Sequence, residues 1–283
     1  MFRDAFASLT LCAAATRRIR IASGVTNPIT RHPAVLAGFF ATLAEAADGR
    51  AVLGLGAGES SVRTIGRRPA TLAEVERCVG TVRTLLAGEE VEGARLAWRA
   101  PRVPIVLAAS APRMLELAGR VADGVLVQVG VDPALVRYAL ERIHAGARAA
   151  GRDPAEVERS LRVACHVDPD ERRARAAVAP YAAVAANTVA RTVPRASIPA
   201  ALHDDLDRLR AGYDYGRHGY ADAPHLRLLT DELVTATAIA GPAELVAARF
   251  GELARLGIDR FVVPLDLADR RSQAEALAAA LAS

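Results

Sequence analysis

Three segments of this chain combine glycine or other small residues with a polar side chain that could do chemistry. Each follows a short apolar run: residues 24–27 are Gly-Val-Thr-Asn, residues 56–59 are Gly-Ala-Gly-Glu, and residues 109–113 are Ala-Ser-Ala-Pro-Arg. In α/β proteins ligands bind at the carboxyl ends of parallel strands, and glycine lets a ligand approach the backbone closely. The three segments therefore predict a ligand site at one edge of a parallel sheet.

The glycine-rich segment ends in a carboxylate that could exchange a proton. Its glycine spacing over residues 54–58 is not the Gly-x-Gly-x-x-Gly fingerprint of dinucleotide-binding proteins. We interpret Gly56 and Gly58 as residues that let a ring system lie against the backbone. Glu59 would then project into the mouth of the site. The alternative for Glu59 is a solvated loop carboxylate.

The segment at 109–113 has the composition of a strand-to-helix corner that binds an anion. Ser110 can cap the helix or bind a phosphate, Pro112 suits the first helical turn, and Arg113 is placed to contact an anion. Helix amino termini present N–H groups that favour anions. An ordinary capped helix explains Ser110 and Pro112 equally well.

Histidines and tyrosines offer two further candidates. His32, beside Arg31 at the start of a helix, could contact a phosphate. We favour a structural role as a cap or turn residue for His32, because no metal partner lies at a usable spacing. A long segment at 191–230 carries four side chains that stand out in an aromatic-poor chain, namely Tyr213, Tyr215, His218 and His225. They indicate either a substrate-side lid or a packed surface loop.

The apolar pattern predicts strands that alternate with helices. Strands are expected at residues 19–26, 51–56, 104–109, 124–129, 160–167 and 259–264. Helices are expected at residues 5–16, 33–46, 71–87, 112–122, 133–150, 170–190, 242–256 and 270–282. The helices that precede Gly49, Gly124 and Gly257 are expected to end at that glycine. Such alternation predicts parallel strands with helices packed outside. The fold class is therefore α/β, a (β/α)8 TIM-barrel type with about six recognisable strands.

These segments give the chain a resemblance to the luciferase-like monooxygenase superfamily. The resemblance is specific to deazaflavin-dependent oxidoreductases similar to methylenetetrahydromethanopterin reductase, and it extends from about residue 3 to residue 265. It implies one TIM-barrel domain over residues 1–283, with an insertion at about 191–230 that contains a short helical piece near 199–211. It also implies coenzyme F420, which reacts by hydride transfer, at the carboxyl ends of the strands.

The resemblance also implies roles for individual residues. In similar enzymes a non-proline cis peptide bond backs the coenzyme ring, and this feature carries over to Gly24–Val25. The residue that matches Glu59 is a proton donor in some deazaflavin-dependent dehydrogenases. Ala111 stands where the family usually has glycine in a corner that holds the coenzyme phosphate. The implied cofactor-binding residues are Gly24, Val25, Thr26, Asn27, Gly56, Gly58, Ala109, Ser110, Ala111, Pro112 and Arg113, and Glu59 is the implied catalytic residue.

Two alternatives to an F420-dependent oxidoreductase stay open. One is a flavin mononucleotide (FMN)-dependent monooxygenase of the same superfamily. The other is an N-terminally truncated relative that binds a ligand or partner without turnover, because the family's first strand, helix and second strand have no counterpart here. An N-terminally incomplete barrel would expose the edges of strands 19–26 and 259–264. We therefore expect either a homodimer that covers these edges or a gene start placed too late.

Composition narrows the classes of partner. The 36 basic residues are all arginine, which indicates codon bias, and the formal net charge is +4. An aromatic content of 4% argues against stacking on single-stranded nucleic acid. The three cysteines, Cys12, Cys78 and Cys165, are expected to be buried thiols with no metal site. No targeting or membrane-spanning pattern is apparent, so we expect a cytoplasmic protein with a small-molecule substrate and neither nucleic-acid nor membrane partners.

Overall fold

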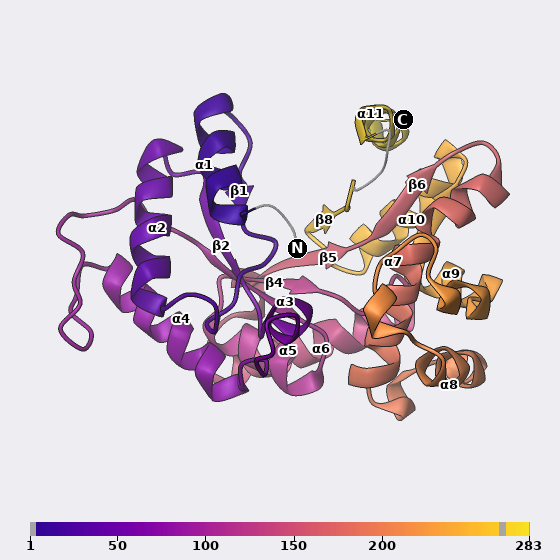
Figure 1. Ribbon diagram of the computed structural model, residues 1–283, viewed down its shortest axis with the longest axis horizontal. Helices are drawn as coiled ribbons and strands as arrows, with labels where there is room; N and C mark the ends of the chain where they lie inside the picture. Colours follow the sequence, from indigo (N-terminus) through magenta and orange to yellow (C-terminus); the bar gives the residue numbers. More distant parts are fainter. Residues whose placement is uncertain (1–3, 266–269, 283) are drawn as a thin grey trace. The chain divides into compact units, whose positions relative to one another are not determined.

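The computed structural model describes residues 4–265 and 270–282 (Figure 1). Its strands are β1 Ile21–Ala22, β2 Ala51–Leu55, β3 Ile105–Ala109, β4 Gly124–Val127, β5 Glu158–Arg162, β6 Ala164–Val167, β7 Ala238–Gly241 and β8 Arg260–Val262. Its α-helices are α1 Ala5–Ala15, α2 Pro33–Ala46, α3 Glu59–Arg63, α4 Leu72–Leu86, α5 Pro112–Val121, α6 Pro133–Ala149, α7 Glu171–Thr192, α8 His203–Ala211, α9 Asp231–Thr237, α10 Ala243–Arg255 and α11 Arg270–Ala282.

The strands form two sheets within the described residues. The larger sheet has six strands in the order β1-β2-β3-β4-β5-β8, and β6 pairs with β7 in a second sheet. The pairs β1–β2, β2–β3, β5–β8 and β6–β7 are all parallel. Parallel strands joined through helices are the architecture that the alternating pattern predicts.

The chain divides into two compact units, each described here by itself. Unit 1 holds the described residues up to Ala109, together with Glu116–Val125 and Ala145–Val157. Unit 2 holds Ser110–Leu115, Leu126–His144 and the described residues from Glu158 onward. The expected single domain with an insertion stays a prediction, but the short helix expected near 199–211 is present as α8.

In unit 1, β2 is buried along its whole length and packs against helix α2, which in turn packs against α4 (Figure 1). Helix α2 has the bounds that the sequence predicts because its first turn is well specified. Pro33 occupies the first turn, and the His32 side chain accepts a hydrogen bond from the Ala34 amide at 3.2 Å. The structural role favoured for His32 is thereby confirmed. Helix α4 starts at a capping box between Thr71 and Glu74.

In unit 2, the strand expected at 160–167 is wrong as a single element. The chain forms β5, which pairs with β8, and then β6, which pairs with β7. Val163 separates the two strands, and its amide donates to the Val262 carbonyl at 3.0 Å. The sequence of residues 160–167 cannot show which partner each half will pair with, so the change of sheet was not predictable.

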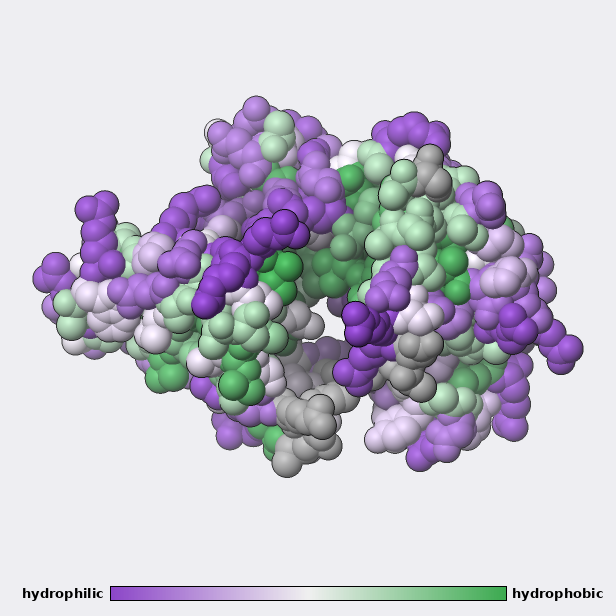
Figure 2. Space-filling model, turned by 90° about the horizontal axis from the view of Figure 1, so that it is seen from above, coloured by the Kyte–Doolittle hydropathy of each residue, from purple (hydrophilic) through white to green (hydrophobic). Residues whose placement is uncertain are grey.

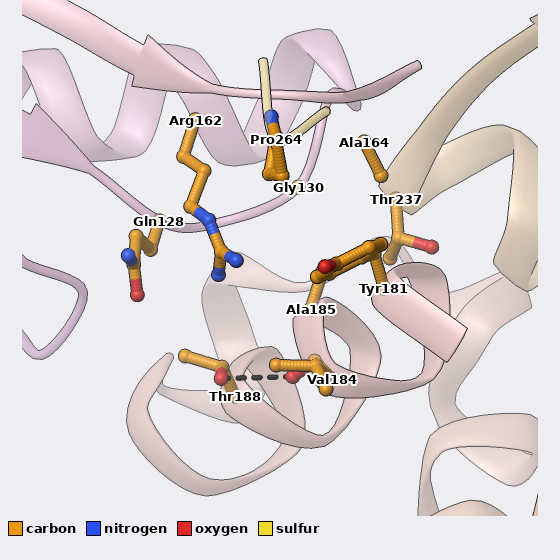
Figure 3. Close-up of a pocket in the computed structure, with 10 residues that line it drawn as sticks. All are labelled: Gln128, Gly130, Arg162, Ala164, Tyr181, Val184, Ala185, Thr188, Thr237 and Pro264. Carbon is orange, nitrogen blue, oxygen red and sulfur yellow. Dashed lines mark hydrogen bonds between the residues drawn. The ribbon is translucent and has the colours of Figure 1, made fainter. Parts of the chain in front are cut away.

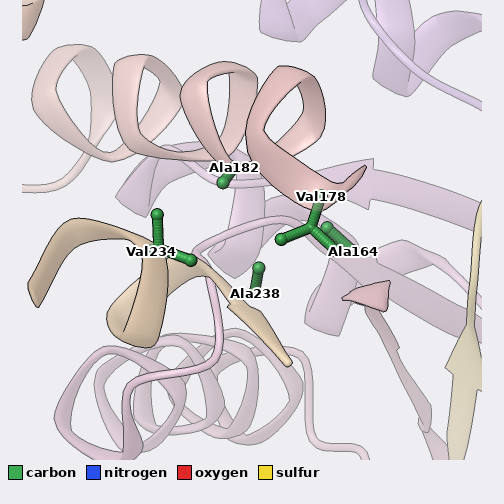
Figure 4. Packing of buried hydrophobic residues seen from close by; sticks show 5 residues of the cluster. All are labelled: Ala164, Val178, Ala182, Val234 and Ala238. Carbon is green, nitrogen blue, oxygen red and sulfur yellow. The ribbon is translucent and has the colours of Figure 1, made fainter. Parts of the chain in front are cut away.

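Small side chains make a second core around β6 and β7. Helices α7 and α9 pack on these strands, as Figure 4 shows. The buried members of this cluster are Ala164, Val178, Ala182, Val234 and Ala238. Alanine on both strands lets the long helix α7 lie close to the sheet. This packing holds α7 against β6 and β7.

Three smaller sequence expectations have mixed outcomes. Gly49 and Gly257 have φ of 77° and 104°, the left-handed conformation that ends a helix, whereas Gly124 instead begins β4 as a buried strand residue. Cys78 and Cys165 are buried, and burial raises the pKa of the Cys78 thiol to about 11. Cys12 is exposed on α1, so the expectation of burial was wrong there.

The described helices include none that is long and apolar enough to cross a membrane. Figure 2 shows hydrophilic residues spread over the visible face, with hydrophobic residues between them.

Candidate active site

The carboxyl ends of β1 and β2 meet in a corner of unit 1 that is held by backbone and hydroxyl hydrogen bonds. The buried Ser23 hydroxyl donates to the Gly54 carbonyl at 2.7 Å and accepts from the Gly54 amide at 3.0 Å. Beyond it, the Thr26 amide donates to the Gly54 carbonyl and the Gly56 amide donates to the Thr26 carbonyl, both at 2.9 Å. The chain therefore leaves β1 at Ser23 and rejoins β2 at Thr26.

Between these two anchors, Gly24 and Val25 bulge out of the pairing. Their peptide bond is cis, as the resemblance implies. Both residues are exposed, Val25 to 37%, although their neighbours Ser23 and Thr26 are buried. The corner thus presents one glycine and one apolar side chain on a fixed frame.

Gly54 in β2 and Gly58 in the segment after it serve the frame itself. A Cβ on Gly54 would lie 1.9 Å from the Ser23 carbonyl oxygen, so only glycine lets the two chains approach here. A Cβ on Gly58, whose φ is 84°, would lie 2.8 Å from Asn27 atoms and 2.5 Å from Val62. The space expected for a ring beside Gly58 is therefore filled by protein. Contact of its backbone with a coenzyme stays a prediction.

Asn27 is buried and organises the loop that follows the corner. Its Oδ1 accepts hydrogen bonds from the Ile29 amide at 3.0 Å, the Thr30 amide at 2.9 Å and the Thr30 hydroxyl at 3.1 Å. Its Nδ2 donates to the Ser61 hydroxyl at 3.4 Å. The side chains of Thr26 and Asn27 face the protein, so any contact they make with a ligand would come from the backbone.

Glu59 is the first residue of the short helix α3, directly after the glycine-rich segment. Its Oε1 accepts a hydrogen bond from Arg63 Nε at 3.0 Å, an i,i+4 ion pair with both side chains about half exposed. The carboxylate is therefore accessible, as an acid–base group must be. It is also held in one direction by its own helix.

The corner after β3 has the predicted form. Ala109 ends β3 as a buried residue, and α5 starts at Pro112 after Ser110 and Ala111. The Ala111 carbonyl accepts from the amides of Met114 and Leu115 at 3.0 and 2.9 Å, which begins the helix. Arg113 is exposed in the first turn. The geometry suits an anion at this helix terminus, and the phosphate role of these residues stays a prediction.

The sequence did not single out a cavity in unit 2 that lies at the carboxyl ends of β4, β5 and β8 (Figure 3). Gln128 follows β4, Arg162 is the last residue of β5, and Pro264 follows β8. Helix α7 closes the other side with Tyr181 and Thr188. The available signal was an arginine between Leu161 and Val163 within the predicted strand, but it does not stand out in a chain with 36 arginines.

The four prominent side chains of segment 191–230 pack largely against one another. The Tyr213 ring stacks on the His225 ring with centroids 4.1 Å apart, and the Tyr213 hydroxyl lies 2.9 Å from His218 Nδ1. His225 is 1% exposed, whereas Tyr215 is exposed and accepts a hydrogen bond from Asn187. Burial lowers the pKa of both His218 and His225. For Tyr213 and His225 the packed loop is confirmed.

Within the described residues, no three His, Cys, Asp or Glu side chains lie close enough together to hold a metal ion.

The family model for luciferase-like monooxygenases matches residues 1–260. The chain belongs to this family. Its resemblance to the luciferase-like superfamily, with the TIM-barrel type of fold, is thereby confirmed.

Similar curated proteins include two reductases of the same name. A 5,10-methylenetetrahydromethanopterin reductase of Methanolobus tindarius is 33% identical over 286 residues, which covers 96% of this chain and 85% of the relative. The protein of the same name from Archaeoglobus fulgidus is 31% identical and covers 92% of this chain and 81% of the relative. The match extends over most of both relatives.

Two solved structures support the fold of this family member. The coenzyme F420-dependent tetrahydromethanopterin reductase from Methanopyrus kandleri superposes with a TM-score of 0.80 at 24% identity, covering 97% of this chain and 86% of the other. An F420-dependent secondary alcohol dehydrogenase in complex with an F420-acetone adduct gives a TM-score of 0.77 at 21% identity, covering 99% and 84%.

The Gly24–Val25 corner has the properties that a flat coenzyme ring requires. A Cβ added to Gly24 would meet no atom within 4 Å, so the space above this residue is open. A Cβ on Gly56 would meet only the Val25 side chain at 3.0 Å and Ala108 at 3.6 Å. An exposed apolar surface with no competing side chain suits a planar ring. The residues present therefore fit a deazaflavin coenzyme.

Proposed function

We propose that this member of the luciferase-like family is an oxidoreductase that transfers a hydride between coenzyme F420 and a small organic substrate. The proposal is carried by the open Gly24–Val25 corner, where two exposed residues stand on a fully hydrogen-bonded frame. Similar proteins whose names call them F420-dependent dehydrogenases, 33% and 34% identical over 56% and 60% of this chain, support F420 as the coenzyme.

The protein's part in such a reaction is to bind and orient. Within unit 1, Gly24 and Val25 would support one face of the coenzyme ring. Within unit 2, the backbone amides at the start of α5, beside Ser110 and Arg113, are proposed separately as a phosphate-binding group. When bound, F420 supplies a carbon centre that accepts or donates a hydride. Glu59 would hold or donate the proton that accompanies hydride transfer, through its exposed carboxyl group.

We also propose a homodimer in the cytoplasm as the working form. The six-stranded sheet ends in β1 and β8, and a second copy of the chain would cover the edges of these strands.

A substrate panel tests the activity. Reduced and oxidised F420 are each incubated with a methylenetetrahydropterin, a secondary alcohol and glucose 6-phosphate, which represent the substrates in the names of similar proteins. Absorbance of the oxidised coenzyme is followed over time. The expected result is turnover with one class of substrate. No turnover with any class, from a sample that binds F420, would contradict catalysis by this route.

The variant Glu59→Gln tests the proposed acid–base role of Glu59. The exposed Glu59–Arg63 pair contributes only about 0.3–0.5 kcal/mol to stability, so the variant should fold normally. Loss of a general acid–base group lowers kcat by about 10²–10⁴-fold. An unchanged kcat would remove Glu59 from the mechanism while leaving the coenzyme assignment intact.

A further inference from the structure

The lining of the pocket at the end of β5 contains one charged side chain, and no carboxylate among the described residues pairs with it. Its ten lining residues include Arg162 and no Asp or Glu. Among the described residues, no carboxylate lies within ion-pair distance of the Arg162 guanidinium. The guanidinium carbon Cζ lies 5.7 Å from the centre of the Tyr181 ring, a cation–π contact. A guanidinium keeps its charge at all ordinary pH values, and its five N–H groups can only donate.

Burial makes this arrangement costly without a ligand. Arg162 is half-buried, and burial lowers the pKa of its guanidinium. A cation taken out of water needs a partner of opposite charge to recover the lost hydration. A second cavity in unit 2 shows the usual solution, since Arg195 there lies 2.7 Å from Asp207. In the Arg162 pocket, no such carboxylate is present among the described residues.

The polar groups around Arg162 favour an oxyanion. Figure 3 shows the guanidinium pointing between Gln128 and Tyr181, toward α7. The Thr188 hydroxyl already donates to the Val184 carbonyl at 2.9 Å. Gln128 brings an amide that can donate beside the guanidinium. Arg162 also acts on its surroundings. Burial is the main cause that lowers the pKa of His218, and the positive charge of Arg162 is the second cause.

The size of the pocket limits the ligand to a small group. The cavity measures about 350 Å³ with its open mouth, but only about 20 Å³ of it admits the centre of a water molecule. A space of this size holds one or two waters. A carboxylate or phosphate group at the end of a larger molecule fits, whereas a coenzyme ring does not.

We propose that Arg162 and Gln128 form an oxyanion subsite that binds a carboxylate or phosphate group of the substrate. The inference rests on the proposed function in one respect, namely that the oxyanion belongs to the substrate of that reaction. The substrate is then an acidic small molecule, anchored at the carboxyl end of β5. A planar guanidinium binds such a group through two parallel hydrogen bonds, which fixes orientation as well as position.

Inorganic phosphate is the first probe, with the full chain in the absence of coenzyme. The NMR signals of the arginine Nε–Hε groups are recorded while phosphate replaces chloride at constant ionic strength. One signal should move saturably, and Arg162→Gln should abolish that signal and weaken phosphate binding by about tenfold to a hundredfold. Arg172→Gln removes an exposed arginine at the start of α7 and should change nothing. Absence of a saturable shift, or equal weakening in both variants, overturns the subsite.

A parallel titration with F420 separates this inference from the proposed function. Arg162→Gln should bind F420 as tightly as the wild type, because the oxyanion is assigned to the substrate. Loss of F420 affinity in this variant would assign Arg162 to the coenzyme phosphate and overturn the substrate subsite. Phosphate binding at Arg162 in a protein that does not bind F420 would refute the proposed function and leave the subsite standing.

Discussion

The corner at Gly24–Val25 and the pocket at Arg162 both lie at carboxyl ends of strands, but they use polar groups in opposite ways. In the corner, the side chains of Ser23 and Asn27 are hydrogen-bonded within the protein. In the pocket, the Arg162 guanidinium has no carboxylate partner among the described residues. The polar side chains of the corner are thus satisfied within the protein, and the corner can contact a ligand only through its exposed surface. The pocket can instead donate hydrogen bonds from a charged side chain.

This difference predicts opposite responses to substitution. Changes in the corner should destabilise the fold, because buried partners would lose their hydrogen bonds or collide. Changes in the pocket should leave the fold intact and alter ligand binding. Stability and affinity therefore separate the two regions experimentally.

The largest effect is expected for Gly54→Ala. The new Cβ would lie 1.9 Å from the Ser23 carbonyl oxygen, so β1 and β2 could not keep their present spacing. We expect a loss of about 3 kcal/mol or more in the free energy of unfolding, or failure to fold. Urea denaturation followed by circular dichroism measures it. Gly24→Ala is the matched control, because its Cβ meets no atom within 4 Å. Equal stability of the two variants would break the description of the corner as a close-packed frame.

A smaller loss is expected for Asn27→Ala. The variant removes the Oδ1 atom that accepts from two amides and one hydroxyl. We expect a loss of about 2 kcal/mol in the free energy of unfolding, since partly buried donors would remain unpaired. The same denaturation experiment applies, with Thr30→Val as a variant that removes one of these donors alone. A change below about 0.5 kcal/mol in Asn27→Ala would show that the loop does not depend on this side chain.

The pocket should respond in the opposite sense to Arg162→Met. Replacing a half-buried cation without a carboxylate partner by an apolar side chain of similar length removes a desolvation cost. The expected change is between zero and about 1 kcal/mol of added stability, measured by denaturation in phosphate-free buffer. A loss above about 1 kcal/mol would mean that Arg162 is a structural residue like those of the corner.

The smallest effect concerns the pH dependence of stability. Burial, followed by the charge of Arg162, lowers the pKa of His218 below its ordinary value of 6.5. The unfolded chain then binds the proton more readily, so stability from this group is complete above about pH 6.5 and is lost as the pH falls toward the lower folded pKa. Arg162→Met should raise the pKa of His218, as followed by NMR titration of the imidazole. An unchanged titration would show that the charge of Arg162 does not reach His218.

Local signals made much of the fold predictable. Helix α2 was predicted with its observed bounds because Pro33 and the cap at His32 specify its start. Most other strands and helices were predicted within a few residues. Strand β7 was missed because Ala238–Gly241 is short and directly follows α9, so its four residues show no period of their own.

The candidate site was predictable only where backbone geometry determines it. Gly54 marks a close approach of β1 and β2, and a resemblance to a known family places the cis peptide bond between Gly24 and Val25. The reason for Gly58 was not predictable, because it depends on packing against Asn27 and Val62. Arg162 was missed because its significance depends on its surroundings in the folded protein, where the described residues place no carboxylate beside it, and no sequence spacing shows this.

Binding of F420 to the purified chain tests the central claim most directly. The fluorescence of F420 is titrated with the wild type and with Gly24→Val, and FMN is titrated in parallel. The account predicts saturable binding of F420 to the wild type at micromolar concentrations, weaker binding to Gly24→Val because the branched side chain fills the open face, and no comparable binding of FMN. Binding of FMN alone would favour the monooxygenase, and a folded protein that binds neither would contradict the proposed function.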